Sequence, residues 1–273
     1  MSRVTTLEAL NTLTATLKKP RCIKQYTGSK TMYGKTSVMS AHSPEGIVYI
    51  KIGVSGECFL GSEHAGYMAC ASSNAVPRTP VVAYAPWIKA KSVPALTEAC
   101  SVLIRAASEF HPDDHITVLV IRSCAGVTLS EFIQTHSESE VARTISLCAK
   151  QIKDMNAHGV YHQDMHCCNI FIPDHGTPHI IDFEYSLVHG TPRAGLSAYD
   201  TDLIADNIST FPNERCDLHK FAVDAWVRAG RPPAHNAIFK TVFDIIGWSP
   251  AICPPCLRTY NRRCLPWAST NSV

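Results

Sequence analysis

Three polar residues in the second half of the chain have the types and spacing of a magnesium site. Asp164 and Asn169 stand five residues apart before an apolar stretch, and Asp182 closes the next apolar stretch. Polar side chains that follow apolar strands lie at strand ends, and a hairpin brings two such ends together. Two carboxylates and an amide that converge there form the all-oxygen site that Mg²⁺ prefers. One such residue alone would indicate a turn cap, but three, with His162 beside them, predict chemistry.

The elements predicted around these residues are a helix, a loop and a two-stranded hairpin. Apolar residues at helical spacing predict a helix over 138–158, with Ser137 or Ser139 as its N-cap. Short strands are predicted at 169–172 and 179–182, on either side of the turn PDHGTP. The loop and the hairpin would therefore hold the three polar residues together.

The first half of the chain is predicted to be mainly sheet and the second half mainly helical. β-branched and aromatic runs bounded by turn residues indicate strands, and apolar residues at helical spacing indicate helices. The predicted strands cover residues 22–28, 35–42, 46–53, 81–85 and 116–123. The predicted helices cover residues 5–18, which Pro20 would end, 62–72, about 94–109, 217–229 and 234–246. The predicted fold class is therefore α+β.

Length and composition are those of an ordinary globular protein. The chain has 273 residues, 45% of them hydrophobic and 18% charged, so it can bury a sizeable core. A net charge of +2 gives no reason to expect a nucleic-acid or membrane partner. The sequence shows neither a signal peptide nor a membrane span, which predicts an intracellular protein of the cytoplasm or nucleus. In that reducing setting, the 12 cysteines are expected to be free, mostly buried thiols.

Three cysteines near the C-terminus need a separate explanation. Cys253 and Cys256 are spaced like metal ligands, and Cys264 follows eight residues later. A structural zinc site needs four ligands, and no second pair with matching spacing stands nearby. The prolines between Cys253 and Cys256 favour a rigid turn instead.

The segment around the polar residues resembles the protein-kinase-like superfamily. HQDMHCCN is similar to the catalytic loop H-R-D-L-x-x-x-N, and IIDFE is similar to the strand that ends in D-F-G. The two aspartates are a family-like 18 residues apart. The resemblance implies that Asp164 orients the acceptor hydroxyl and accepts its proton. It also implies that Asn169 and Asp182 hold Mg²⁺ and that His162 is the structural histidine of the catalytic loop.

The resemblance extends toward the N-terminus. VYIKI is similar to the third-strand motif V-A-I-K, which implies that Lys51 binds the α- and β-phosphates of ATP. Glu63 is the expected partner of that lysine, and Glu57 is the alternative. YTGSKTMYG is similar to the loop that covers the phosphates, with Gly28 and Gly34 among its glycines.

Two further segments complete the resemblance, which covers about residues 22–230. RSCAGVTL is similar to a hinge between two lobes, which implies that backbone groups from Arg122 to Cys124 contact the adenine. CDLHKFAVDAW resembles the helix whose aspartate, Asp217, braces the backbone of the catalytic loop. The implied architecture is a two-lobed kinase-like fold, with a small antiparallel-sheet N-lobe and a reduced helical C-lobe. Its expected boundaries are a helical extension at 1–21 and a kinase-like domain at 22–273, with the N-lobe at 22–121, the hinge at 122–126 and the C-lobe at 127–273.

Several positions depart from the family pattern. Ser29 and Thr31 replace glycines of the phosphate-covering loop, which stiffens it. Tyr49 stands where a small alanine usually roofs the adenine. Gln163 replaces an arginine that pairs with a phosphorylated activation loop in many members, so activity is expected to be independent of such phosphorylation. Glu184 replaces the glycine of D-F-G and removes a flexible hinge.

The leading hypothesis is transfer of the ATP γ-phosphoryl group to Ser or Thr hydroxyls of a protein substrate. The spacing of 35 residues from Asp182 to Asp217 favours it, as does the resemblance of DLHKFAVDAW to protein kinases. Small kinases with such departures resemble those of large DNA viruses, herpesviruses among them, which would act in a host cell, and the haspin-like atypical kinases.

Two alternatives remain open. His166 and the run IDFEYS are similar to choline kinases and aminoglycoside phosphotransferases, which implies a small alcohol as the acceptor. The altered phosphate-covering loop and Tyr49 would fit a pseudokinase, a binding module without turnover. Against that alternative, the chain keeps all four residues of the expected machinery, which are Lys51, Asp164, Asn169 and Asp182.

Overall fold

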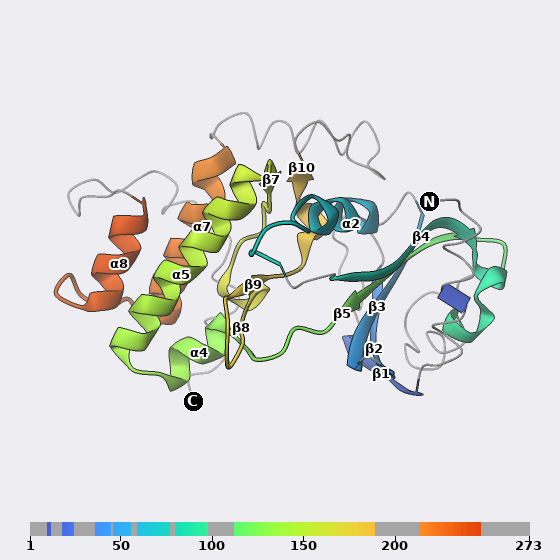
Figure 1. Ribbon diagram of the computed structural model, residues 1–273, viewed down its shortest axis with the longest axis horizontal. Helices are drawn as coiled ribbons and strands as arrows, with labels where there is room; N and C mark the ends of the chain where they lie inside the picture. The colour runs from blue at the N-terminus through green and yellow to red at the C-terminus, as the bar shows by residue number, and fades with distance from the viewer. Residues whose placement is uncertain are drawn as a thin grey trace, which may run out of the picture.

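The computed structural model describes residues 10–11, 18–24, 36–44, 46–55, 59–76, 80–97, 112–188 and 213–246. These residues form an α+β fold, as the sequence predicts, with antiparallel sheets and several helices. A five-stranded sheet lies at one end of the molecule and a group of helices at the other (Figure 1). Helix α2 (Leu60–Ala69) and two small sheets lie between them.

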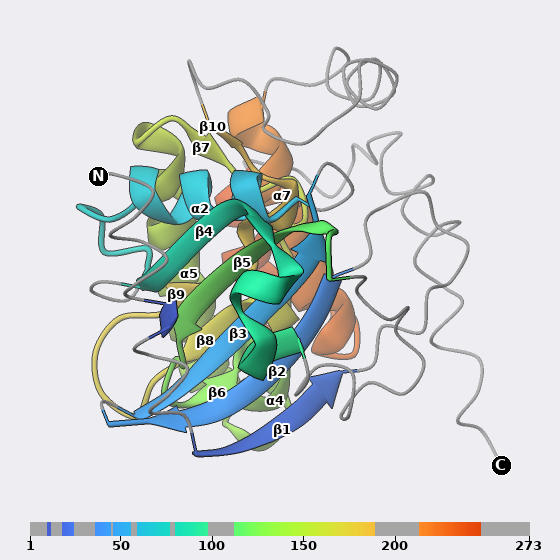
Figure 2. The same cartoon turned by 90° about the vertical axis from the view of Figure 1, so that its right-hand side faces the viewer.

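The large sheet is antiparallel throughout, with its strands in the order β1-β2-β3-β5-β4 (Figure 2). Its strands are β1 (Lys18–Lys24), β2 (Thr36–Ser43), β3 (Gly46–Val54), β4 (Val81–Lys89) and β5 (His115–Arg122). The strands predicted at 35–42, 46–53, 81–85 and 116–123 are therefore confirmed. β4 continues past Pro86 because it is an edge strand with a register shift between Ala85 and Ile88, where a proline can be accommodated.

The prediction of a helix at 5–18 that ends at Pro20 is wrong at its C-terminal end. Lys18–Lys24 is instead the edge strand β1, which pairs with β2. The pairing shifts register between Lys18 and Arg21, and a proline fits such an irregular place on an edge because it has no N–H to donate. Positions 10–11 of the predicted helix lie within the described residues and are helical. The first strand of the sheet thus starts earlier than predicted.

The two faces of the sheet carry different residues because successive side chains of a strand point to opposite faces. Ile50 and Ile52 of β3 belong to a buried group on one face, here called the outer cluster. Tyr49 and Lys51 alternate with them and point to the other face, toward α2. The outer cluster consists of Leu10, Met39, Ala41, Val48, Ile50, Ile52, Ala83, Ala85, Ala90, Val93, Leu96, Ile116, Val118 and Val120.

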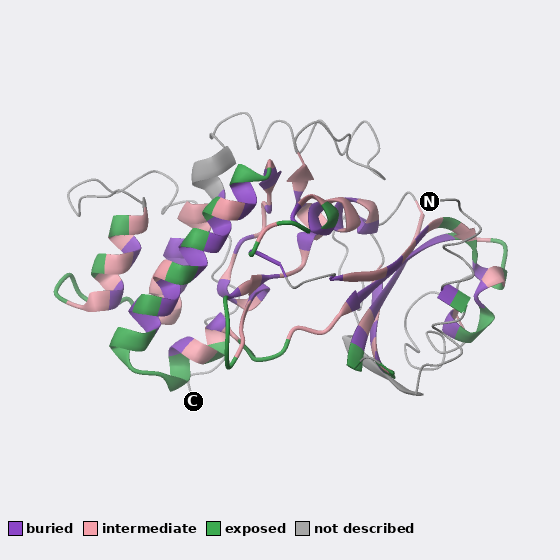
Figure 3. Ribbon diagram, viewed as in Figure 1, coloured by how far each residue is buried: buried purple, intermediate pink, exposed green. Residues whose placement is uncertain are grey.

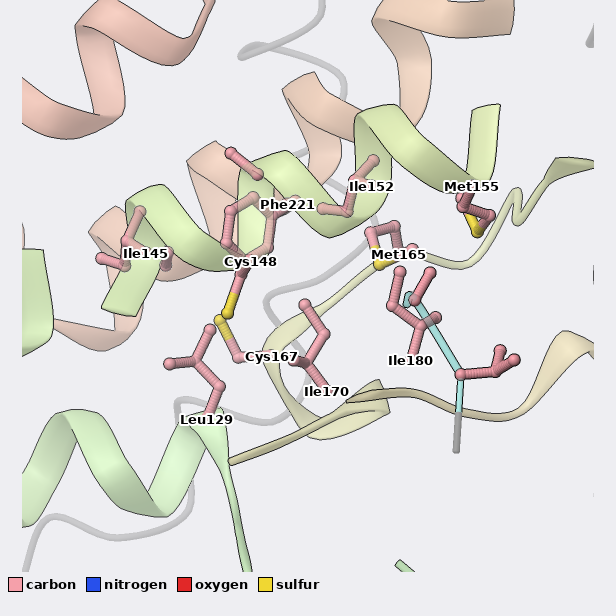
Figure 4. Packing of buried hydrophobic residues seen from close by; sticks show 14 of the residues in the cluster. Leu129, Ile145, Cys148, Ile152, Met155, Met165, Cys167, Ile170, Ile180 and Phe221 are labelled. Atoms are coloured by element: carbon pink, nitrogen blue, oxygen red, sulfur yellow. The ribbon is translucent and has the colours of Figure 1, made fainter. Parts of the chain in front are cut away.

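A second buried group, here called the central cluster, joins the sheet to the helices. It includes Leu60 and Tyr67 of α2 and Leu119 and Ile121 of β5. Its other members come from the loops and short strands around the site and from α4 (Leu129–Thr135), α5 (Glu138–Ala157), α7 (Asn213–Arg228) and α8 (Ala237–Ile246). Figure 4 shows part of the cluster, with Ile145, Cys148, Ile152 and Met155 along α5 and with Leu129 and Phe221 near them.

The helices at the far end of the molecule confirm those predicted at 138–158, 217–229 and 234–246. Ser137 precedes α5, and its backbone N–H donates to the Glu140 carboxylate at 3.0 Å. α5 packs against both α7 and α8, and its outer side is exposed while its inner side is buried (Figure 3). This burial on one side is what the apolar spacing of the sequence indicates.

α4 was not predicted, although its sequence carries a start signal. Glu131 N donates to Thr128 Oγ1 at 3.2 Å, and Thr128 N donates to Glu131 Oε2 at 2.8 Å, which is a complete capping box. The helix predicted at 62–72 is present as α2. Of the helix predicted at 94–109, only 94–97 lie within the described residues, after the short 3-10 helix η1 (Ala90–Ser92).

Two small sheets frame the loop that carries the polar residues. They are built from β6 (Val127–Thr128), β8 (Ile170–Ile172) and β9 (His179–Ile180), and from β7 (Val160–Tyr161) paired with β10 (Leu187–Val188). Both strands of the predicted hairpin are shorter than expected. Asn169 belongs to the 3-10 helix η2 (Cys167–Asn169), and Asp182 leaves the extended conformation with a φ of +65° before the 3-10 helix η3 (Phe183–Tyr185).

A short connection leads from β5 to the helical end of the molecule. Ser123 N donates to Ile47 O at 3.0 Å, which fixes its start to β3. Gly126 has a φ of +104°, and a Cβ atom there would lie 2.0 Å from Ile172 O. Only glycine fits this position, because both the backbone conformation and the contact exclude a side chain.

The cysteines whose side chains the structure describes are free, as expected. Cys70, Cys148 and Cys167 are buried, and Cys124 and Cys168 are partly exposed. Within the described ranges, no helix has the length and apolar character needed to cross a membrane.

Candidate active site

Lys51 lies between two carboxylates from distant parts of the chain. Its Nζ atom is 2.8 and 2.9 Å from the two carboxylate oxygens of Glu63 and 2.6 Å from Asp182 Oδ1. β3 supplies the lysine, α2 supplies Glu63, and the segment after β9 supplies Asp182. The structure therefore places the lysine against the predicted partner Glu63, while the alternative, Glu57, lies outside the described residues.

Burial and charge act against each other in this group. The Glu63 carboxylate is fully buried, and burial raises its pKa to about 7 even though Lys51 opposes the shift. Burial would lower the pKa of Lys51, but the carboxylates of Glu63 and Asp182 hold it well above its ordinary value. Burial would raise the pKa of Asp182, whose side chain is 37% exposed, but Lys51 brings it below its ordinary value. Lys51 is therefore a cation and Asp182 an anion at neutral pH.

The start of the loop 162–169 is held by a buried carboxylate of α7. Asp217 is fully buried, and its two oxygens accept hydrogen bonds from His162 N at 2.7 Å and from Gln163 N at 2.9 Å. Asn156 Nδ2 donates to the same carboxylate at 3.2 Å. Gln163 has a φ of +66°, so the backbone turns sharply just before Asp164. Asp217 thus contacts the backbone of this loop, as the sequence resemblance implies.

Sequence reasoning missed the other polar residues of the same helix. Lys220 Nζ donates to Gln163 O, and Asp224 Oδ2 accepts from Cys167 N at 2.8 Å. Arg228 Nε donates to the same Asp224 oxygen at 2.9 Å. Together with Asp217 these residues recur three or four positions apart, so they share one face of α7. That recurrence of charged residues between apolar ones was a signal available in the sequence.

His162 and Asn169 tie the loop to the strand that leads to Asp182. The His162 ring is fully buried, and its Nε2 atom donates to Ile181 O at 2.8 Å. Ile181 N donates to Asn169 O at 3.0 Å, and Asn169 Nδ2 donates to Asp164 O at 3.0 Å. These bonds bring Asp164, Asn169 and Asp182 to one end of the hairpin.

Asp164 has a histidine as its neighbour. His166 Nε2 lies 3.5 Å from Asp164 Oδ2. Burial would lower the pKa of His166, but Asp164 and Cys168 raise it to about 10. Burial would raise the pKa of Asp164, but His166 brings it below its ordinary value. The pair is therefore a carboxylate beside an imidazolium at neutral pH.

α2 packs closely on the segment that follows Asp182. The Tyr67 hydroxyl accepts a hydrogen bond from Asp182 N at 3.2 Å, and the Tyr67 ring meets the Phe183 ring edge-on, with 4.8 Å between centroids. The Phe183 ring in turn lies 5.1 Å from the His162 ring. A Cβ atom on Gly66 would lie 2.8 Å from Phe183 Cβ, so the helix approaches as closely as glycine allows. Tyr67 and Gly66 were not among the predicted site residues.

The predicted adenine-binding segment is only partly available for a ligand. Arg122 N donates to Pro80 O at 2.9 Å, so this N–H group is already used. An adenine contact in the segment must therefore use other backbone groups, such as those of Cys124. Tyr49 points to the same face of the sheet as Lys51, two residues along β3.

Other predicted residues lie outside the part of the chain that the structure describes. Gly28 and Gly34 of the expected phosphate-covering loop are among them, as are Cys253, Cys256 and Cys264. Residues 189–212, which follow β10, are also outside it.

The donor set fits a magnesium ion. Asn169 Nδ2 donates to Asp164 O, so the side-chain oxygen of Asn169 is the atom that can coordinate a cation. With the Asp182 carboxylate it provides two oxygen ligands, and phosphate and water oxygens would complete the shell. Across the described residues, no three His, Cys, Asp or Glu side chains form a group that could hold a metal ion.

The site consists of a buried lysine between two carboxylates and a braced loop that carries an aspartate and an asparagine.

A comparison of the chain with models of protein families and with curated proteins found no match.

Proposed function

We propose that the chain is an ATP- and Mg²⁺-dependent phosphotransferase with a two-lobed protein-kinase-like fold. The observation that carries the proposal is the contact of Lys51 with both Glu63 and Asp182, which lie 12 and 131 residues away in the sequence. Buried charges are costly, and an apolar trio would stabilise a fold at least as well. A lysine held in this way is suited to bind phosphate, because its ammonium group has a fixed position beside Asp182, the expected metal ligand.

The chain's own residues have separate tasks in the proposed reaction. Lys51 binds the α- and β-phosphates, and Glu63 holds its ammonium group in place. Asp164 orients the acceptor hydroxyl, whose oxygen forms a bond to the γ-phosphorus while the bond from that phosphorus to the β,γ-bridging oxygen breaks. The hydroxyl proton passes to Asp164, and ADP leaves. When bound, Mg²⁺ neutralises charge on the phosphate oxygens. Most of the rate enhancement would come from positioning and electrostatics.

The acceptor that we propose first is a Ser or Thr hydroxyl of a protein. A small alcohol is the second candidate, and a specific observation favours it. His166 is part of the sequence similarity to choline kinases and aminoglycoside phosphotransferases. Its Nε2 atom lies 3.5 Å from the carboxylate of Asp164. In the proposed reaction, this positive charge would lie beside the acceptor oxygen that Asp164 orients and would attract the transferred phosphoryl group.

The proposal is tested by incubating the purified protein with ATP labelled at the γ-phosphate and with MgCl₂. One set of reactions contains basic and acidic protein substrates, and another contains choline, ethanolamine and aminoglycosides. Asp182→Asn and Asp164→Ala should abolish transfer. Asp174→Asn, which changes an exposed aspartate of the β8–β9 turn in the same way, should leave it unchanged.

Each result identifies one of the candidates. Label on protein that both variants abolish supports a protein kinase, and label on an alcohol alone supports the second candidate. If ATP binds but no label is transferred, the chain is a binding module. If ATP does not bind at all, the roles of Lys51 and Asp182 are refuted.

A further inference from the structure

The loop 162–169 is held by α7 at both ends. Asp217 accepts the N–H groups of His162 and Gln163 at its start, and Asp224 accepts the N–H of Cys167 near its end. The two carboxylates stand seven residues apart, or two helical turns, on the same face of α7. Asp164 lies between these two anchors. Asn169 lies just beyond the second.

The second anchor acts on the start of η2, the short helix that ends in Asn169. The first N–H groups of a helix have no partner within it and need one from outside. Cys167 is the first residue of η2 and is fully buried, so water does not replace the Asp224 carboxylate there. Loss of this acceptor would leave a buried N–H unpaired, and η2 could relieve this only by moving. Movement of η2 carries Asn169 with it.

Asp224 is itself held from two sides. Arg228 Nε donates to the same Asp224 oxygen that accepts from Cys167, and Arg228 Nη1 donates to Ser130 Oγ of α4 at 2.6 Å. Gln134 of α4 also donates to Arg228 O at 2.8 Å. The carboxylate position is therefore fixed by two helices that pack against each other. A nearly buried carboxylate that is held in this way keeps the backbone N–H group that donates to it in a fixed position.

We propose that Asp224 is a positioning residue for magnesium binding: through Cys167 N and η2 it sets the place of Asn169, and Arg228 with Ser130 supports it. This role rests on the proposed function, because it takes Asn169 to be a metal ligand. Asp217 fixes the entry to the loop and Asp224 its exit. The span between the two carboxylates on α7 thereby sets the distance from the acceptor-orienting Asp164 to the metal-holding Asn169.

The test measures ATP binding by calorimetry at a series of MgCl₂ concentrations, together with thermal unfolding of each variant. Asp224→Ala should raise the Mg²⁺ concentration for half-maximal tightening of ATP binding by about tenfold or more, as partners of metal ligands typically do. ATP affinity without Mg²⁺ should stay unchanged. Asp224→Asn should restore the wild-type Mg²⁺ dependence to within about threefold, because one oxygen accepts both hydrogen bonds and asparagine keeps that oxygen.

A double variant separates positioning from general damage. In the background of Asn169→Ala, Asp224→Ala should cause no further change in Mg²⁺ dependence, because it acts through Asn169. An equal loss of ATP affinity with and without Mg²⁺, or an additive effect in the double variant, would overturn the positioning role and leave the phosphotransferase proposal standing. Wild-type binding that ignores Mg²⁺ would overturn both.

A milder variant covers the case in which Asp224→Ala does not fold. Ser130→Ala removes the hydroxyl that accepts from Arg228 and that also bonds to the Cys168 side chain, so the Asp224 carboxylate keeps its contact with Cys167 N but loses part of its support. It should shift the Mg²⁺ dependence in the same direction by about two- to threefold. No shift in a folded Ser130→Ala protein would overturn the part of the proposal that assigns support to Arg228 and Ser130.

Discussion

Replacement of Gly66 by alanine should destabilise the protein, although the same change stabilises most helices. In a helix interior, Gly→Ala normally adds about 0.5–1 kcal/mol of stability. In α2, a Cβ atom on Gly66 would lie 2.7 Å from Ser186 Oγ and 2.8 and 2.9 Å from Phe183 Cβ and Cδ1. Carbon atoms in contact are normally about 3.5–4.0 Å apart. The helix must therefore move away from η3.

The size of the effect follows from this overlap. Overpacking of a buried contact by one methyl group costs about 1–3 kcal/mol, which outweighs the helix-propensity gain. The expected result is a lower free energy of unfolding, by about 1–2 kcal/mol, in urea denaturation. Glu63 lies one turn before Gly66, so the shift of α2 also draws its carboxylate away from Lys51. ATP affinity should fall with stability.

Gly46→Ala is the matched control for this change. Gly46 has no atom within 4 Å of its would-be Cβ, but its φ is +119°, so alanine there introduces backbone strain without contact. It should cost about 1–3 kcal/mol and leave ATP affinity unchanged. If Gly66→Ala raised the stability of the protein, the close approach of α2 to η3 would be refuted, because only the helix-propensity gain would remain.

Two further predictions concern stability. Gly126→Ala should cost about 3 kcal/mol or more, because backbone strain adds to a clash with Ile172 O. Gly176→Ala has the same kind of strain without the clash, so it should cost less in the same urea titration, and equal costs would contradict the packing of the connection. The pKa of Glu63 is raised from 4.5 to about 7, so the folded state binds its proton more tightly than the unfolded chain. The free energy of unfolding should therefore fall by up to about 3 kcal/mol as pH rises through that window. Glu63→Gln should flatten this pH profile, and an unchanged profile would refute the raised pKa of Glu63 as its cause.

The parts of the fold and site that could be predicted are those fixed by nearby residues. α5 follows from an apolar stripe and its N-cap, and the strands β2, β3 and β5 follow from short β-branched runs. Asp164, Asn169 and Asp182 were found because one loop and one hairpin position all three. Local sequence carries enough information for such elements. Whether these residues carry out phosphoryl transfer stays a prediction, as do the domain boundaries.

The parts that could not be predicted depend on contacts between distant segments. Residues 18–24 lack a helix because pairing with β2 provides a better use of their backbone groups. Tyr67 and Gly66 matter because α2 is pressed against η3, which α2's own sequence does not reveal. The left-handed conformation of Asp182 ends its strand early, and aspartate only tolerates that conformation without demanding it. Asp224 is an exception, because its helical spacing from Asp217 was visible in the sequence and could have been used to predict it.

The boundary between the two hydrophobic clusters does not coincide with the connection that separates the sheet from the helices along the sequence. The connection after β5 separates the sheet from the helices along the sequence, but the central cluster extends across it to α2 and to one face of β5. The boundary between the clusters lies instead within the thickness of the sheet, where Leu119 and Ile121 face one way and Val118 and Val120 the other. Cutting the chain after β5 would therefore leave apolar side chains of the central cluster facing water on both pieces. α2 precedes this connection in the sequence but packs against η3 and β10, which follow it.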